Sequence, residues 1–113
     1  MDKQRARRRL CGCYVTVPTL FHDADLGLNL AGIAKHVEFL RAGGLCEGNC
    51  VLLAGGAAGD FSTMSLEERL QVAETVIGAA EGEIPVAVGA QTTGTRELQE
   101  LARSAHALGA DYI

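Results

Sequence analysis

The chain contains no tryptophan and few aromatic residues of any kind, which together make up 4% of its 113 positions. It contains only two prolines, and no apolar run reaches the roughly 18 residues that a membrane-spanning helix needs. Apolar residues nevertheless account for 48% of the chain, and glycine occurs 14 times. This balance excludes a disordered chain and is typical of a globular α/β domain.

Positive charge is concentrated at the start of the chain. Five of the ten lysines and arginines lie within the first nine positions, although the net charge of the whole chain is −4. Such a segment is either a frayed, solvated terminus or an electrostatic contact, and we expect the first for residues 1–10. The segment has no aromatic residue for base stacking, and no signal peptide follows it. We therefore expect a cytoplasmic protein that binds neither nucleic acid nor membranes.

Four cysteines form two close pairs, Cys11 with Cys13 and Cys46 with Cys50. The C-x-C and C-x3-C spacings do not match the paired motifs of structural zinc sites. Each pair precedes an expected strand, so all four sulfur atoms could approach one another at one end of a sheet. We expect reduced thiols rather than a metal site or a disulfide, and we expect no cofactor.

Strand-like and helix-like segments alternate along the chain. Runs of apolar and β-branched residues predict strands over 13–17, 50–54 and 85–89, the middle one buried on both faces. Apolar residues at helical spacing predict a helix over 28–42, a second that begins after Ser65 and ends at Gly82, and a third with Thr95 as its N-cap. Ser65 and Glu68 have the spacing of a capping box.

The order of these segments limits the architecture to two possibilities. Three βα units with short connections require right-handed parallel crossovers, which occur in an open doubly wound sheet and in a (β/α)8 TIM barrel. Residues 109–111 lead into what looks like a fourth strand. Because a complete barrel needs about 200 residues or more, the barrel interpretation makes residues 11–113 its amino-terminal half, with three βα units and the start of strand 4.

The glycine-rich turn from Gly55 to Asp60 is the strongest candidate for a site. It follows the buried middle strand, and α/β proteins bind ligands at the carboxyl ends of parallel strands. Glycines allow close approach to the backbone, whose amides can hold an anion. The alternative is a tight turn that binds nothing.

Five segments of the chain carry a family resemblance. They are Pro18–Phe21, Gly56–Asp60, Ser65–Arg69, Pro85–Gly89 and Gly109–Asp111. In order and spacing they resemble the Thr-Pro-Phe segment, the Gly-Thr-Thr-Gly-Glu loop, the helix start, the third strand and the Gly-Ala-Asp sequence of the dihydrodipicolinate synthase and N-acetylneuraminate lyase family.

The resemblance implies a TIM barrel and a class I aldolase-type lyase. In that family a lysine on a later strand forms a Schiff base with pyruvate or a related 2-keto acid, and a tyrosine relays protons. The resemblance places both residues beyond Ile113. The only lysines here are Lys3 and Lys35, in the basic segment and the first helix, and we assign neither a catalytic role. We expect this segment alone to be inactive and the full-length protein to be a homo-oligomer.

The resemblance also implies substrate-binding residues. The backbone amides of Ala57 and Ala58 would hold the carboxylate of the 2-keto acid, and Thr19 and Gln91 are further candidates at the same end of the sheet. Ala58 has no hydroxyl where the family has a threonine that joins the proton relay. We interpret this departure as a sign of a divergent aldolase or dehydratase acting on a sugar-derived 2-keto acid.

Two other functions remain open. One is a small α/β binding module whose Gly55–Asp60 turn holds an anionic ligand without covalent chemistry. The other is an inactive remnant that associates with itself or with a partner to cover exposed strand edges.

Overall fold

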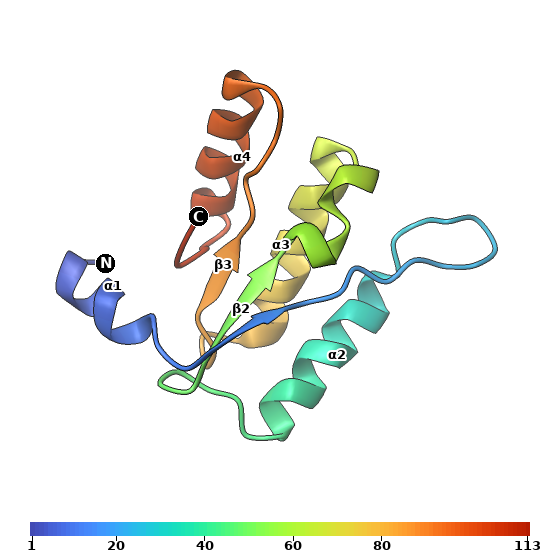
Figure 1. Ribbon diagram of the computed structural model, residues 1–113. Helices are drawn as coiled ribbons and strands as arrows, with labels where there is room; N and C mark the ends of the chain where they lie inside the picture. Colours follow the sequence, from blue (N-terminus) through green and yellow to red (C-terminus); the bar gives the residue numbers. More distant parts are fainter.

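Three short parallel strands form one sheet in the computed structural model, which describes residues 1–113 (Figure 1). The strands lie in the order β1-β2-β3, so the second is hydrogen-bonded on both sides. Helices alternate with them. The elements are α1 (Lys3–Arg9), β1 (Cys13–Thr16), α2 (Leu30–Ala42), β2 (Cys50–Ala54), α3 (Leu66–Ala80), β3 (Val86–Val88) and α4 (Thr95–Ala107), with short 3-10 turns η1 (Ala57–Gly59) and η2 (Phe61–Thr63) between β2 and α3.

The strand register separates the side chains into two faces. Val15 lies beside Leu52, and Leu52 lies beside Val86. Because successive side chains alternate in a strand, this row and its neighbours at every second position share one face. That face forms the core with Ile33 and Val37 of α2, together with Val72, Ala73 and Val76 of α3 and Ala105 of α4. The helices that supply the core therefore cover a single face of the sheet.

The chain continues past α4 to the free edge of β3. Tyr112 forms a parallel bridge with Ala87, and the Val88 amide donates to the Tyr112 carbonyl at 3.0 Å. The segment around Tyr112 therefore occupies the place of a fourth strand beside β3, and the strands still follow one another in chain order. A doubly wound sheet carries helices on both faces and reverses its strand order. The observed arrangement is instead consistent with part of a barrel.

Local sequence signals locate several element boundaries correctly. The second strand spans 50–54 as expected, and the predicted capping box is present: the Ser65 amide donates to Glu68 Oε2 at 2.8 Å, and the Glu68 amide donates to Ser65 Oγ at 3.2 Å. The prediction of Thr95 as an N-cap is wrong. Gly94 occupies the cap with an extended backbone, and no side chain caps this helix.

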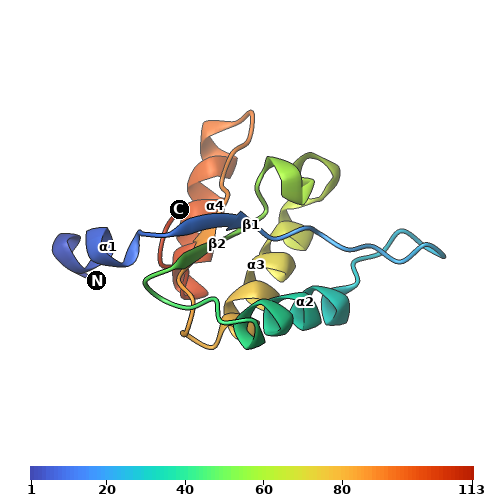
Figure 2. The ribbon, with the colours of Figure 1, turned by 60° about the horizontal axis from the view of Figure 1, so that its bottom comes forward.

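Residues 1–10 are more ordered than the frayed segment that we expected. They form α1, which Asp2 caps by accepting a bond from the Arg5 amide at 2.9 Å. Arg9 is 8% exposed, its Nε donates to Glu47 at 2.8 Å, and its Nη1 pairs with Asp111. The two carboxylates compensate for the desolvation of the guanidinium. Figure 2 shows α1 beside the start of β1, at the opposite end of the sheet from the loop that follows this strand.

No helix of the structure is both long enough and apolar enough to cross a lipid bilayer.

We expect Arg9→Met to lower the free energy of unfolding by about 1–3 kcal/mol, because it leaves Asp111 without its buried partner. Urea denaturation followed by circular dichroism measures this change. Arg8→Met is the matched control, since Arg8 is exposed and makes no ion pair. Equal effects of the two substitutions would show that α1 is not held by the Arg9 pair.

Candidate functional site

The turn after β2 is held in an unusual backbone path. Gly55 has a φ of +65°, and Asp60 closes the following η1 turn in the left-handed region with a φ of +56°. The backbone at Gly56 runs so close to Leu53 that an added Cβ would lie 2.5 Å from Leu53 Cδ2. The turn therefore depends on glycine at its start, and the two residues at its tip, Ala57 and Ala58, are exposed.

Two neighbouring amides at this tip are free to bind. The Gly59 amide donates to the Gly56 carbonyl at 2.9 Å, and the Asp60 amide donates to the Ala57 carbonyl at 3.3 Å. The amides of Ala57 and Ala58 donate to no group of the chain. Adjacent unpaired N–H groups on an exposed turn form a donor pair for an anion such as a carboxylate. The methyl side chains beside them add no hydroxyl or charge.

Thr19 reaches the turn from the segment after β1. Its hydroxyl donates to the Gly59 carbonyl at 2.6 Å, and the residue is only 6% exposed. The structure thus places Thr19 beside the candidate site, as the sequence interpretation expected. Its only hydroxyl proton, however, is already committed to the backbone of the turn.

Gln91 reaches the same turn from the loop after β3. Its Nε2 donates to the Gly55 carbonyl at 2.9 Å. Close by, the Gly89 amide donates to the Ala54 carbonyl at 2.8 Å, which ties the ends of β3 and β2 together. The four predicted binding residues are therefore gathered around one turn, two at its tip and two at its ends.

Arg69 lies close to the site, although the sequence analysis did not single it out as a binding residue. It is 6% exposed, its Nη2 donates to the Gly89 carbonyl at 2.9 Å, and its guanidinium lies 5.1 Å from the Phe61 ring centroid. Its Nε has no partner, and burial lowers the pKa of the side chain, while Glu97 acts in the opposite direction. The helical spacing could have predicted the burial of Arg69, because position 69 lies on the same face of α3 as Val72 and Val76.

No amine or thiol joins this site. Lys35 is exposed on α2, and Lys3 lies in α1 at the other end of the sheet. The four cysteines are free, and no cluster of His, Cys, Asp or Glu side chains has the arrangement of a metal site. Burial, followed by the nearby Cys13 and Cys46, raises the pKa of the Cys50 thiol, which favours its unreactive protonated form.

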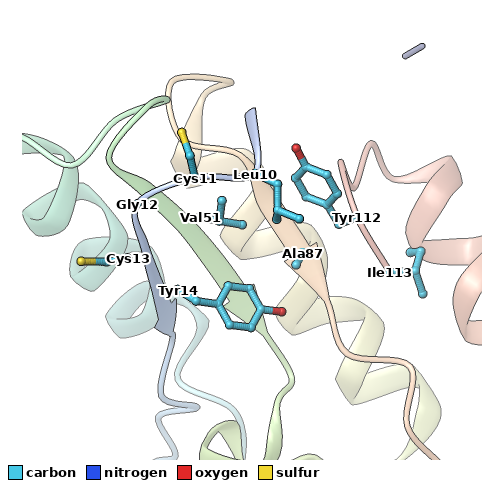
Figure 3. Close-up of a pocket in the computed structure, with 9 residues that line it drawn as sticks. All are labelled: Leu10, Cys11, Gly12, Cys13, Tyr14, Val51, Ala87, Tyr112 and Ile113. Carbon is cyan, nitrogen blue, oxygen red and sulfur yellow. The ribbon is translucent and has the colours of Figure 1, made fainter. Parts of the chain in front are cut away.

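An apolar cavity of about 470 Å³, separate from the turn, lies on the face of the sheet that the helices leave open (Figure 3). Tyr14 projects over it from β1, with Val51, Ala87 and Tyr112 around it. Tyr14 and Ile113 remain 60% and 57% exposed. In a closed barrel, this is the face whose side chains fill the interior.

The parallel sheet, covered by helices on one face only, defines an α/β class of protein and is consistent with part of a barrel. Residues 10–113 match the profile of the dihydrodipicolinate synthetase family. The chain therefore belongs to this family, which confirms the resemblance inferred from the five segments.

Individual relatives agree with this assignment. The 4-hydroxy-tetrahydrodipicolinate synthase of Pseudomonas aeruginosa is 35% identical over 102 residues, which cover 90% of this chain and 33% of the relative. The corresponding synthase of Chlorobium chlorochromatii is 34% identical over 104 residues, covering 92% and 33%. The chain thus spans about a third of the length of these relatives.

Solved structures show the same partial correspondence. The dihydrodipicolinate synthase from Acinetobacter baumannii, complexed with pyruvate, is 32% identical with a TM-score of 0.78, and the match covers 88% of this chain and 32% of that one. YagE, a protein of the same family from E. coli K12 solved with pyruvate, is 32% identical with a TM-score of 0.80, covering 89% and 32%.

The junction of β2 and β3 should be intolerant of side chains. A Cβ added at Gly89 would lie 2.5 Å from the Gly55 carbonyl oxygen, so we expect Gly89→Ala to cost about 1–3 kcal/mol of stability. Gly78→Ala, in open space on α3, is the matched control and should instead stabilise by about 0.5–1 kcal/mol. Thermal denaturation compares the two variants, and a neutral Gly89→Ala would contradict the close packing of the two strand ends.

Proposed function

We propose that this chain supplies the carboxylate-binding wall of a Schiff-base-forming lyase, an aldolase or dehydratase that acts on pyruvate or a sugar-derived 2-keto acid. The observation that carries the proposal is the pair of free, exposed amides at Ala57 and Ala58. They lie directly after the central strand, where α/β barrels bind their substrates. Membership of the family and the relatives solved with pyruvate support the choice of ligand.

The chemistry divides between binding and bond making. The two amides would each donate a hydrogen bond to a carboxylate oxygen and so fix the orientation of the adjacent keto carbon. A neutral lysine amine would then attack that carbon and form the Schiff base, with the keto oxygen leaving as water. The protonated imine accepts the electron pair when a neighbouring carbon–carbon bond forms or breaks. We propose that the lysine and the relay tyrosine belong to the two thirds of the relatives that this chain does not match, because Lys3 and Lys35 are remote from the turn.

The two alanines of the turn should affect proton transfer more than carboxylate binding. Backbone amides bind a carboxylate whatever side chains they carry, so Ala57 and Ala58 preserve the proposed cradle. A methyl group cannot pass a proton, however, and general acid–base relays typically contribute about 10²–10⁴-fold to rate. We infer that the protein either relays protons by another route or acts on a substrate whose turnover needs the relay less.

Carboxylate binding is testable with the 113-residue chain. Titration with pyruvate should shift the backbone amide resonances of Ala57 and Ala58 saturably, with a Kd on the order of 1 mM for two hydrogen bonds on an open surface. Acetone, which has the ketone without the carboxylate, should leave them unchanged. Borohydride should trap no adduct on Lys35. Equal shifts with acetone would contradict the proposal, and stronger binding of inorganic phosphate than of pyruvate would favour the non-covalent binding module.

A chimera tests the catalytic assignment. Residues 10–113 would replace the matching third of the Pseudomonas aeruginosa synthase, which supplies the rest of the barrel. We expect this chimera to form a borohydride-trappable Schiff base with pyruvate but to turn over slowly. Ala57→Thr combined with Ala58→Thr should raise kcat at least about 10-fold by restoring hydroxyls.

The isosteric double variant with valine at both positions is the control for the chimera, because it matches threonine in shape without the hydroxyl. An equal gain with valine would show that the turn limits the rate through packing. A folded chimera that forms no Schiff base would refute the assignment to a pyruvate lyase.

A further inference from the structure

We propose that Thr19 and Gln91 are positioning residues that hold the two ends of the Gly55–Asp60 turn, and that neither contacts the substrate. The inference rests on the proposed function only for the identity of the ligand, a 2-keto acid carboxylate. The positioning itself follows from the hydrogen bonds of the ligand-free chain.

Gln91 fixes the entry to the turn. Its Nε2 donates to the carbonyl of Gly55, the residue with positive φ at which the backbone leaves the direction of β2. The Gln91 side chain folds back over Gly89, since a Cβ added there would lie 2.7 Å from Gln91 Oε1. Arg69 in turn donates to the Gly89 carbonyl. The Gln91 donor therefore extends from a backbone segment that is itself held in place.

Thr19 fixes the exit from the turn. Its buried hydroxyl donates to the Gly59 carbonyl at 2.6 Å. The same glycine packs against the end of β1, since an added Cβ would lie 3.1 Å from the Val17 carbonyl oxygen. The last part of the turn is thus held by the segment after β1, while its first part is held by the loop after β3.

The hydrogen bonds from Thr19 and Gln91 favour anion binding because their acceptors are carbonyl oxygens of the turn. The carbonyl oxygens of Gly55 and Gly59 carry partial negative charge, and each is turned toward a donor from a neighbouring segment. Between them, the amides of Ala57 and Ala58 are left unpaired. If either end were released, the turn would sample other conformations. The apparent affinity would then fall in proportion to the fraction that still presents both amides.

The test uses four substitutions in the 113-residue chain. Thr19→Val and Gln91→Met remove the donors with little change in size, whereas Thr93→Val and Gln71→Met make the same changes at exposed positions whose side chains bond to nothing in the chain. Two quantities are measured by NMR: the backbone order of Ala57 and Ala58 without ligand, and the Kd for pyruvate. We expect both donor-deleting variants to lower the order of the two alanines and to raise the Kd about 5–10-fold, with the controls unchanged.

Two rescue variants separate positioning from general loss of packing. Thr19→Ser keeps the hydroxyl and should restore both the order of the turn and the Kd. Gln91→Glu can donate to the Gly55 carbonyl only while the carboxyl is protonated. Its turn should therefore be ordered at low pH and become mobile as the pH rises through the carboxyl pKa, about 4.3 in model peptides, whereas the parent turn should not respond.

The possible failures are distinguishable. Unchanged order of Ala57 and Ala58 in Thr19→Val and Gln91→Met would overturn the positioning role, as would failure of Thr19→Ser to restore it. If the parent chain binds no pyruvate, the proposed function fails, and the ligand-free order measurement still decides the roles of Thr19 and Gln91.

Discussion

The central strand β2 is the constraint on which the rest of the molecule depends. It is hydrogen-bonded to a parallel neighbour on each side. Its residues on the helix-covered face, Cys50, Leu52 and Ala54, pack into the common core. At its carboxyl end, the Leu53 carbonyl accepts from the Val17 amide and the Ala54 carbonyl accepts from the Gly89 amide. These two bonds bring the segments after β1 and β3 to the same height as the turn after β2. The gathering of the site residues is therefore a result of strand pairing.

The features that could be predicted from the sequence are those with local causes. An apolar run defines β2, and the four-residue capping box marks the start of α3. Strand order and the carboxyl-edge rule brought Thr19 and Gln91 near the turn, but they could not show that their donors are committed to carbonyl groups of the turn. The partners are 40 and 36 residues away in sequence. No local pattern encodes such a pairing.

Two buried arginines show how long-range context changes the meaning of one residue type. Burial lowers the pKa of Arg9, but the hydrogen bonds that its guanidinium donates to Glu47 and Asp111 more than offset this effect, so its pKa is raised. Arg69 has no carboxylate bonded to it, and its pKa is lowered by burial. One guanidinium forms an ionic link between α1 and distant segments, and the other rests on an aromatic ring and a carbonyl. From the sequence alone, Arg9 was expected in a solvated terminal segment, and the burial of Arg69 was not predicted.

The composition gives the open face of the sheet an optical label. The chain has two tyrosines and no tryptophan, so its near-ultraviolet emission arises from Tyr14 and Tyr112. Both side chains line the cavity on the face that the helices leave uncovered (Figure 3). Tyr112 is half-buried and its hydroxyl donates to the Ala6 carbonyl at 2.7 Å, whereas Tyr14 is 60% exposed. Whatever covers that face, whether further strands of a barrel or a second polypeptide, moves the Tyr14 ring out of water. A change in tyrosine emission therefore reports closure of the sheet without an added probe.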